Sequence, residues 1–515
     1  MKKFISLIVG ILFLVFLAGC GTQTNAVATF EFEDESIDLK SVQFTVVIDD
    51  PETEITGTIT VKLYNQSDEE VRSKIIASDL DLENIQFLNL TENHTYTIKV
   101  HASMGRNTEV IGTTTFKTLS TGVTTIMSEQ DFLNMKSNRA GTYILGKDLD
   151  FSDIDFVSPF TTSFTGSFDG DGYTIRNVTF SKVATYTGLF GYVSTGTIKN
   201  LNIENVEIGR AEAPLTMSLS SRVGIVAGYV SNLAGKIEDV TIKNSSIHFT
   251  TSSTVQAFVG GIVGENRGQI KNVSLENTYI NLKSTSYGDI KLGGVAGVLG
   301  EDSTLKEIKS EVDVTYELEG GTIKDRDFSI FIGGLVGDNN AHMVTRSVEN
   351  VYSMGDVTVT NLDFNTQTGT TEGLYKVYVG GLAGMSYGVI YNAFYGGSMM
   401  INHEKNEFET NVNKYFYIGG LIGFYGSSRT SMHVLKQGES QTVEANLSDD
   451  VILKISQVIA QKLTGTFNAS IYGDTHLVLN GDSIVDDDTF TLIDDLEDFF
   501  TSTWIEDAYE AVYTS

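Results

Sequence analysis

A short glycine-rich motif recurs seven times along this chain of 515 residues and constrains its fold more than any other feature. The motif closes at Gly191, Gly228, Gly264, Gly297, Gly337, Gly384 and Gly423, with unequal spacing between copies. A constant core with variable spacing is typical of a solenoid, in which each repeat stacks on the next and only the loops differ in length. The chain has 50 glycines but 3 prolines, so these glycines do not belong to Pro/Gly-rich linkers.

A second signature, an apolar residue followed two positions later by Asn, comes after most copies of the glycine motif. Examples are Ile198 to Asn200, Ile270 to Asn272 and Ile390 to Asn392, and Ile175 to Asn177 adds a copy before the first motif. The intervening segments are rich in Val, Ile, Thr and Phe, which predicts strands that stack at ~4.8 Å on the next coil. We expect glycine where stacking leaves no room for Cβ or where φ is positive, and Asn where amides bond from coil to coil.

The combined pattern resembles the GLUG repeat of bacterial surface proteins, over residues 160–428. We assign residues 161–440 to these repeats, residues 119–160 to an N-terminal cap, and residues 441–515 to a C-terminal cap or a small α/β domain. Ser128 is the expected N-cap of a short helix over residues 128–135, and Ser448 of another that continues to residue 463. Apolar residues at helical spacing also occur between Leu496 and Trp504.

The N-terminus carries the features of an export signal. Two lysines precede an apolar run from Phe4 to Leu17, which is shorter than the ~20 residues that a spanning helix needs. The run ends in Leu-Ala-Gly-Cys at Cys20, which resembles the bacterial lipobox. The resemblance implies that residues 1–19 are a signal peptide, that Cys20 receives diacylglycerol, and that residues 20–28 form a tether. The protein would then be lipid-anchored at the extracellular face of the cell membrane, or at an outer membrane where the organism has one.

Residues 29–118 alternate apolar and polar side chains in short runs, which predicts an antiparallel sandwich of about seven strands. Leu90 and Tyr96 resemble the tyrosine corner of fibronectin type III and immunoglobulin-like domains, although Glu92 stands where that family usually has proline. The predicted fold class is therefore all-β, with an N-terminal Ig/fibronectin-like sandwich followed by a right-handed parallel β-helix with small α caps.

Charge and motif content limit the classes of function. A net charge of −31 excludes a nucleic-acid partner, since phosphates would be repelled. The single cysteine excludes multi-cysteine metal sites, and the Asp-Gly pairs from Asp169 to Gly172 are typical of turns. Zinc IgA-protease-like proteins can carry GLUG repeats, but His403-Glu404 is followed by Glu407 where an HExxH motif needs His. We therefore expect no catalytic residue, cofactor or metal, and a protein that is not an enzyme.

Three aromatic residues mark a candidate ligand platform on the last repeats. The position two after the Asn is polar in the early coils but becomes Tyr352 and then Phe394, with Tyr391 nearby. Exposed aromatics predict a binding surface for an extracellular glycan or protein, whereas the alternative is a stabilising stack or one covered by residues 441–515. The leading hypothesis is a surface lipoprotein for adhesion or partner binding. The alternatives are a polysaccharide-degrading β-helix enzyme and the substrate-capturing component of an export or uptake system.

Overall fold

A computed structural model describes most of the chain between residues 25 and 493. The ranges left out within it are 33–35, 77–82, 252–255, 285–287, 319–320, 324–327, 345, 361–363, 367–372, 403–411, 426–432, 438–441, 447–451, 457–467, 473–475, 480–481 and 484–490. The predicted signal peptide, Cys20 and the apolar spacing between Leu496 and Trp504 lie outside the described residues. The chain forms two compact units, Met1–Thr118 and Leu119–Ser515, and each is described by itself.

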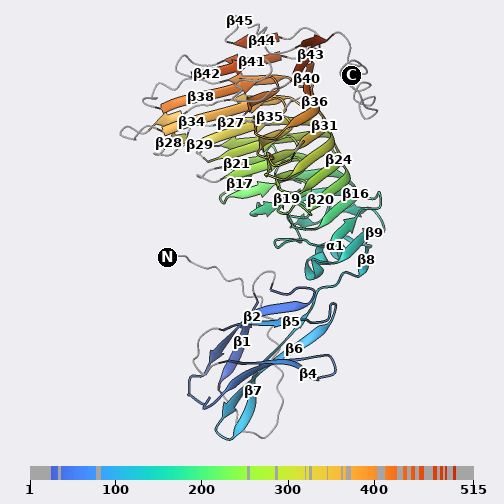
Figure 1. The fold of residues 1–515 in the computed structure, drawn as a ribbon, viewed down its shortest axis with the longest axis vertical. Coiled ribbons are helices and arrows are strands. Elements are labelled where there is room, and N and C mark those ends of the chain that lie inside the picture. The colour runs from blue at the N-terminus through green and yellow to red at the C-terminus, as the bar shows by residue number, and fades with distance from the viewer. Residues whose placement is uncertain are drawn as a thin grey trace. The chain divides into compact units, whose positions relative to one another are not determined.

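The first unit is a sandwich of two antiparallel sheets, which confirms the predicted seven strands (Figure 1). The three-stranded sheet contains β1 (Val27–Glu31), β2 (Ser41–Asp49) and β5 (Glu83–Leu88). The four-stranded sheet contains β4 (Glu70–Ile76), β3 (Ile59–Tyr64), β6 (Thr95–Met104) and β7 (Asn107–Lys117), in that order. Alternate residues of β6 are buried, as the period-two pattern predicts.

A hydrogen bond to the Tyr96 hydroxyl stabilises the turn that leads into β6. The backbone N–H of Thr91 donates to the Tyr96 hydroxyl at 3.0 Å, and the Tyr96 ring stacks on Phe116 at a centroid distance of 5.6 Å. Both rings are buried. This contact is the one expected of a tyrosine corner, in which the hydroxyl bonds the backbone a few residues upstream.

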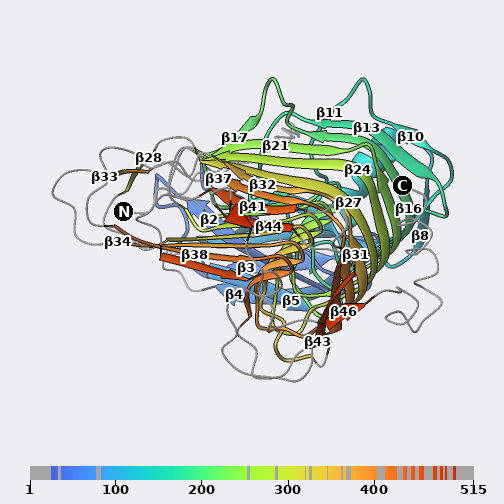
Figure 2. The ribbon, with the colours of Figure 1, turned by 90° about the horizontal axis from the view of Figure 1, so that it is seen from above.

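The second unit is a parallel β-helix with three sheets, whose strands lie over one another when the stack is viewed from its end (Figure 2). The wide sheet contains β8 (Val123–Ile126), β9 (Thr142–Leu145), β10 (Leu149–Asp150), β11 (Asp155–Phe156), β12 (Ser167–Asp169), β13 (Thr174–Phe180), β16 (Thr197–Ile208), β17 (Leu215–Met217), β20 (Lys236–Lys243), β21 (Ser246–Thr251), β24 (Gln269–Ser284), β27 (Thr304–Leu318), β31 (Val348–Ser353), β32 (Val357–Thr360), β36 (Ile390–Tyr395), β37 (Met399–Asn402), β40 (His433–Gln437), β41 (Thr442–Asn446), β43 (Asn468–Tyr472), β44 (His476–Leu479), β45 (Asp482–Ser483) and β46 (Thr491–Ile493).

Two narrow sheets complete each coil. The first narrow sheet contains β14 (Tyr186–Thr187), β18 (Ser221–Val223), β22 (Ala257–Gly260), β25 (Ile290–Gly293), β29 (Phe328–Gly333), β34 (Gly373–Gly380), β38 (Val412–Gly419) and β42 (Ile452–Ser456). The second narrow sheet contains β15 (Tyr192–Val193), β19 (Ala227–Val230), β23 (Val263–Asn266), β26 (Ala296–Leu299), β30 (Val336–Asn339), β35 (Ala383–Ser386) and β39 (Ile422–Tyr425). A short pair of β28 (Gly321–Ile323) and β33 (Phe364–Thr366) lies outside them. The chain passes from the first narrow sheet to the second and then to the wide sheet.

The repeated glycines lie at the corner between the two narrow sheets, where successive coils approach closely. A Cβ added to Gly260 would lie 2.5 Å from the Cα of Ala296 in the next coil, and one added to Gly294 would overlap the carbonyl oxygen of Gly334. Among the glycines that close the motif, Gly191 is the one with positive φ. Lack of space, the first of the two predicted reasons, therefore explains the column.

The Asn signature forms two columns of bends, both with left-handed backbone. The first contains Asn200, Asp239, Asn272, Glu307, Asn350 and Asn392, and the second contains Asn177, Asn205, Asn244 and Asn277. Amides bond between coils as expected: Asn272 donates to Asp239 at 2.6 Å and Asn392 to Asn350 at 2.6 Å. The assignment of Asn177 to the first column is wrong, because register pairs its strand with the segment at Asn205.

A helix closes the N-terminal end of the β-helix, as predicted. It comprises α1 (Glu129–Asn134), followed by a 3₁₀ turn η1 (Met135–Asn138). Ser128 Oγ accepts from the backbone N–H of Asp131 at 3.1 Å, and Asp131 accepts from Met127 N–H at 3.0 Å, which is a reciprocal cap. Phe132 is fully buried and meets Phe168 edge to face at 5.7 Å. The helix therefore covers the open end of the core.

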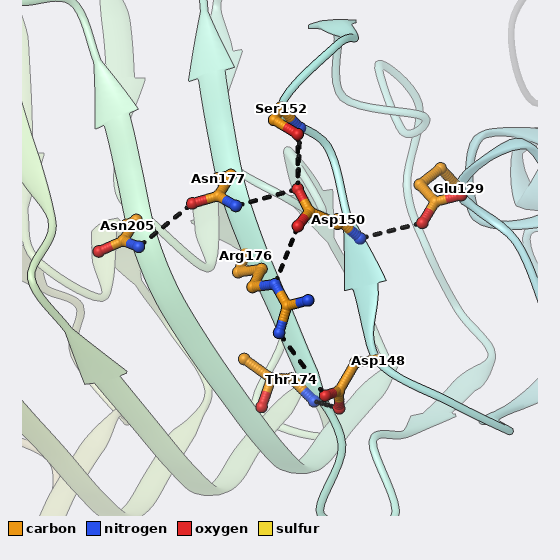
Figure 3. Close-up of polar contacts among 8 residues, drawn as sticks. All are labelled: Glu129, Asp148, Asp150, Ser152, Thr174, Arg176, Asn177 and Asn205. Atoms are coloured by element: carbon orange, nitrogen blue, oxygen red, sulfur yellow. Dashed lines mark hydrogen bonds and ion pairs between the residues drawn. The ribbon is translucent and has the colours of Figure 1, made fainter.

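Asp150 joins this cap to the first coil (Figure 3). Its carboxylate accepts hydrogen bonds from Asn177 Nδ2 at 2.9 Å, Arg176 Nε at 3.0 Å and Ser152 Oγ at 2.8 Å, while its backbone N–H donates to Glu129. These donors hold the pKa of Asp150 well below its usual range. Because Asn177 accepts from Asn205 in turn, Asp150 begins the chain of hydrogen bonds that leads into the second column of bends.

The strands after residue 440 continue the coils. β41, β43, β44 and β46 pair in parallel within the wide sheet, and β42 pairs in parallel with β38 of the first narrow sheet. The parallel coils therefore extend beyond residue 440, where the predicted GLUG-like repeats end. The helix predicted from Ser448 is also wrong at residues 452–456. These residues form β42, which pairs with the exposed edge of β38.

Candidate functional site in the groove between the narrow sheets

The residues that flank the glycine motif face outward on both sides of the corner between the narrow sheets. Val259 and Val263 enter the core, whereas Phe258 and Glu265 do not belong to it. Register stacks these flanking residues into two ladders. The first ladder contains Tyr186, Arg222, Phe258, Lys291, Phe331, Tyr378 and Tyr417, and the second contains Tyr192, Tyr229, Glu265, Val298, Asp338, Met385 and Phe424.

The middle rungs of the two ladders line a cavity of about 690 Å³, which we call the groove. Arg222, Phe258, Lys291, Glu265 and Val298 contribute from the ladders. The segments next to these strands add Ser231, Asn232, Leu233, Gln256, Arg267, Gly300, Glu301, Asp302, Asn340 and His342. The groove thus combines donors, acceptors and apolar side chains, which is typical of a binding site.

Two buried carboxylates lie in the centre of the ladders, each held by cations. Glu265, 3% exposed, accepts from Arg222 Nε and from Arg267 Nε, the latter at 2.8 Å. Asp338, 1% exposed, accepts at Oδ2 from Lys291 Nζ at 2.6 Å and from Asn340 Nδ2 at 2.7 Å. Opposite charges lower the cost of burial.

Aromatic rings separate these cations along the first ladder. The Arg222 guanidinium lies 5.2 Å from the Phe258 ring centroid and 5.0 Å from that of Tyr229. Lys291 Nζ lies between Phe258 and Phe331, at 5.2 and 5.4 Å from their centroids. These are cation–π distances, and they hold each cation in place within the ladder.

Both ends of the ladders are aromatic. Phe331, Tyr378 and Tyr417 stack at 4.8 and 4.7 Å with interplanar angles of 4° and 11°, and Phe424 meets Tyr417 edge-on. Burial raises the pKa of Tyr378 far above its usual value. At the other end, Tyr192 and Tyr229 stack at 5.5 Å. Because the rings stack on each other, they present their edges rather than their faces.

The predicted aromatic platform is stacked but not open. Tyr352 and Phe394 are register partners in β31 and β36, as expected. Their exposure, however, is 6% and 1%, so the prediction of exposed rings is wrong for both. A ring inside a parallel ladder has a strand on either side at ~4.8 Å, which covers its faces. Tyr391 is half-buried beneath the Arg346 guanidinium, which lies 3.8 Å from its ring centroid.

The groove was missed at the sequence level, although a signal for it exists. The glycine motif is nearly constant, whereas the residue two before it and the residue directly after it change between aromatic, charged and aliphatic types. Variation beside a constant motif on a regular scaffold is where binding residues are expected. In the part of the chain that the structure describes, no group of three or more His, Cys, Asp or Glu side chains is placed to hold a metal ion.

One protein family matches part of the chain. Residues 125–244, which include α1 and the first coils, match the N-terminal region of the M26 IgA1-specific metallo-endopeptidases. No curated protein and no solved structure matches this chain. The expectation that the protein is not an enzyme is contradicted by the family match, because it connects the chain to a peptidase family through that family's N-terminal region. Among the described residues, no helix is both long and apolar enough to cross a membrane.

Proposed function

We propose that this protein is a lipid-anchored surface protein whose β-helix binds an extended polypeptide of a partner in the groove between the narrow sheets. The lipobox-like sequence before Cys20 supports the anchor and the extracellular location. The observation that carries the binding role is the pair of ladders, in which cations and carboxylates lie between two aromatic ends.

The ring geometry favours a polypeptide over a glycan. Sugars stack on the faces of aromatic rings, but the faces of Tyr378 are covered by Phe331 and Tyr417. Tyr, Phe, Met and Arg are the residues enriched at protein interfaces. Six steps of ~4.8 Å span about 29 Å along the ladders, which is the length of about nine extended residues.

A second role is favoured by the family match. The chain could hold a protein substrate for a peptidase, as the substrate-capturing component of a larger system, because residues 125–244 match the N-terminal region of a peptidase family. Polysaccharide hydrolysis is less well supported, since Glu265 and Asp338 both accept hydrogen bonds from cations, whereas a general acid must donate.

A peptide-binding assay tests the proposed role. The full chain is screened against a library of labelled nonapeptides by fluorescence anisotropy, and the best binder is measured again with Phe258→Ala. We expect at least a tenfold weaker affinity, since Phe258 lines the centre of the groove. Tyr279→Ala, an exposed ring on the wide sheet, is the matched control and should bind normally. Absence of any binding peptide, or equal loss in both variants, contradicts the proposal.

The anchor is tested by Cys20→Ser in cells fed radiolabelled palmitate. We expect the wild-type chain to take up label and to remain with the membrane fraction, while the variant does neither. Labelling of the variant to the wild-type level contradicts attachment at Cys20.

A further inference from the structure

The geometry points to a carboxylate-binding site at the centre of the groove, where Arg222 and Arg267 receive an acidic side chain of the bound polypeptide. This inference rests on the proposed peptide binding and names the chemistry that the groove selects. The observation behind it is that two guanidinium groups share one carboxylate, that of Glu265.

Both guanidinium groups use the same atom for that contact. Arg222 and Arg267 each donate from Nε to Glu265. Among the described residues, their terminal nitrogens make no hydrogen bond, and both side chains line the groove. A guanidinium donates best along its edges, where pairs of N–H groups match the two oxygens of a carboxylate. Each group therefore retains an edge for a ligand.

The rings around Arg222 direct a ligand to that edge. Phe258 and Tyr229 lie 5.2 and 5.0 Å from the guanidinium, and the side chain is 24% exposed. Arg267 is 56% exposed, so it can reach a ligand in the groove. Apolar surroundings strengthen a charge-assisted hydrogen bond relative to one in water.

The charges near this point leave a positive excess in an otherwise acidic chain. Arg222 and Arg267 carry two positive charges against one on Glu265, and Lys291 is matched by Asp338. Glu301 and Asp302 stand on the rim in an exposed turn, where water and salt screen their charges. The Arg222 guanidinium, whose side chain is 24% exposed, is screened less than these rim charges and therefore dominates at the centre.

Three matched nonapeptides test this inference on the full chain. Each has Phe and Tyr near its ends and differs at the central residue, which is Glu, Gln or Lys, and binding is followed by fluorescence anisotropy. We expect the Glu peptide to bind about tenfold more tightly than the Gln peptide, and the Lys peptide to bind most weakly. In Arg267→Gln, the preference for Glu over Gln should fall to about twofold or less.

Arg210→Gln is the control for a general loss of charge. Arg210 is 58% exposed and forms an ion pair with Glu207 at 2.7 Å at the end of β16, in the wide sheet. The Arg210→Gln variant should leave the preference for the Glu peptide over the Gln peptide unchanged. Equal binding of the Glu and Gln peptides, or the same loss in both arginine variants, overturns the carboxylate site while peptide binding stands. If no peptide of the three binds and the library also yields none, the proposed function fails and this inference fails with it.

Discussion

The groove and the outer face of the wide sheet are built from the same parallel stacking, yet they differ in how they hold charge. In the groove, Glu265 is 5% exposed by its side chain and bonds two guanidinium groups. On the wide sheet, the pair of Lys243 and Glu276 joins side chains that are 47% and 44% exposed. The corner between the narrow sheets removes water from one set of charges and leaves the other set solvated. Equal numbers of ion pairs therefore do not make equal contributions to stability or binding.

The largest loss of stability is expected from a bulky substitution at the corner between the two narrow sheets. Gly294→Val places side-chain atoms where the backbone of Gly334 already lies, so we expect the free energy of unfolding to fall by about 4 kcal/mol. Chemical denaturation followed by circular dichroism measures the loss. Ser274→Ala, at a half-buried outward position of the wide sheet, is the control and should change stability by less than about 0.5 kcal/mol. A near-neutral Gly294→Val would contradict close coil contact as the reason for glycine.

The second largest loss of stability is expected when the buried carboxylate of Glu265 is removed. Glu265→Gln removes the buried carboxylate that Arg222 and Arg267 share, and we expect a loss of about 3 kcal/mol in the same denaturation experiment. The matched change on the wide sheet, Glu276→Gln, should cost about 0.5 kcal/mol because its partner Lys243 remains solvated. Equal losses in the two variants would contradict the contrast between the two surfaces.

A smaller effect is expected at the bends of the wide sheet. Asn272 has a φ of 52° and donates to Asp239 at 2.6 Å. Asn272→Ala loses both the tolerance for left-handed backbone and the hydrogen bond, so we expect about 1–2 kcal/mol of destabilisation. Asn272→Gly keeps the backbone freedom and should cost less, about 1 kcal/mol. If Gly costs as much as Ala, the backbone conformation is not what selects Asn.

The smallest expected effect is the loss of stability at low pH that results from protonation of the half-exposed Asp150. Its pKa is lowered in the folded protein, so its stabilising contribution is complete above about pH 4 and is lost as the pH falls below that value. Asp150→Asn should therefore show a smaller drop in melting temperature between pH 6 and pH 3 than the wild type. Asp153→Asn, an exposed neighbour, should retain the wild-type drop. An identical drop in Asp150→Asn contradicts the network's part in acid sensitivity.

Much of the architecture could be predicted because its signals are local. The alternation in residues 29–118 gave the seven-stranded sandwich, and the recurring glycines gave the stacked coils, since close backbone contact selects glycine at every corner. The capping helix was predicted because Asp131 follows Ser128 by three residues, the spacing of a helix N-cap. The residues of β42 were predicted to be helical because a short apolar run is compatible with the spacing of a helix and with that of a buried strand.

The candidate site could not be predicted in the same way. Tyr352 and Phe394 were correctly placed as neighbours, but they are buried at 6% and 1% exposure, and register alone does not report how far a ring is exposed. Arg222, Glu265 and Lys291 lie far apart in the sequence and meet because the register sums the lengths of whole coils. The glycine motif aligns Arg222 with Lys291 along one ladder, but it does not indicate which side chains meet across the corner.

The sequence by itself determined that the chain is all-β, that it repeats, and where glycine is required, since strand alternation and backbone contact act over a few residues. Tertiary structure alone decided which side chains meet across the corner and how far they are removed from water. Glu265 between two arginines and Asp338 beside Lys291 gain their partners only when separate coils stack in register. The same side chains on the wide sheet would be solvated, and it is the enclosure between two narrow sheets that turns them into a candidate binding groove.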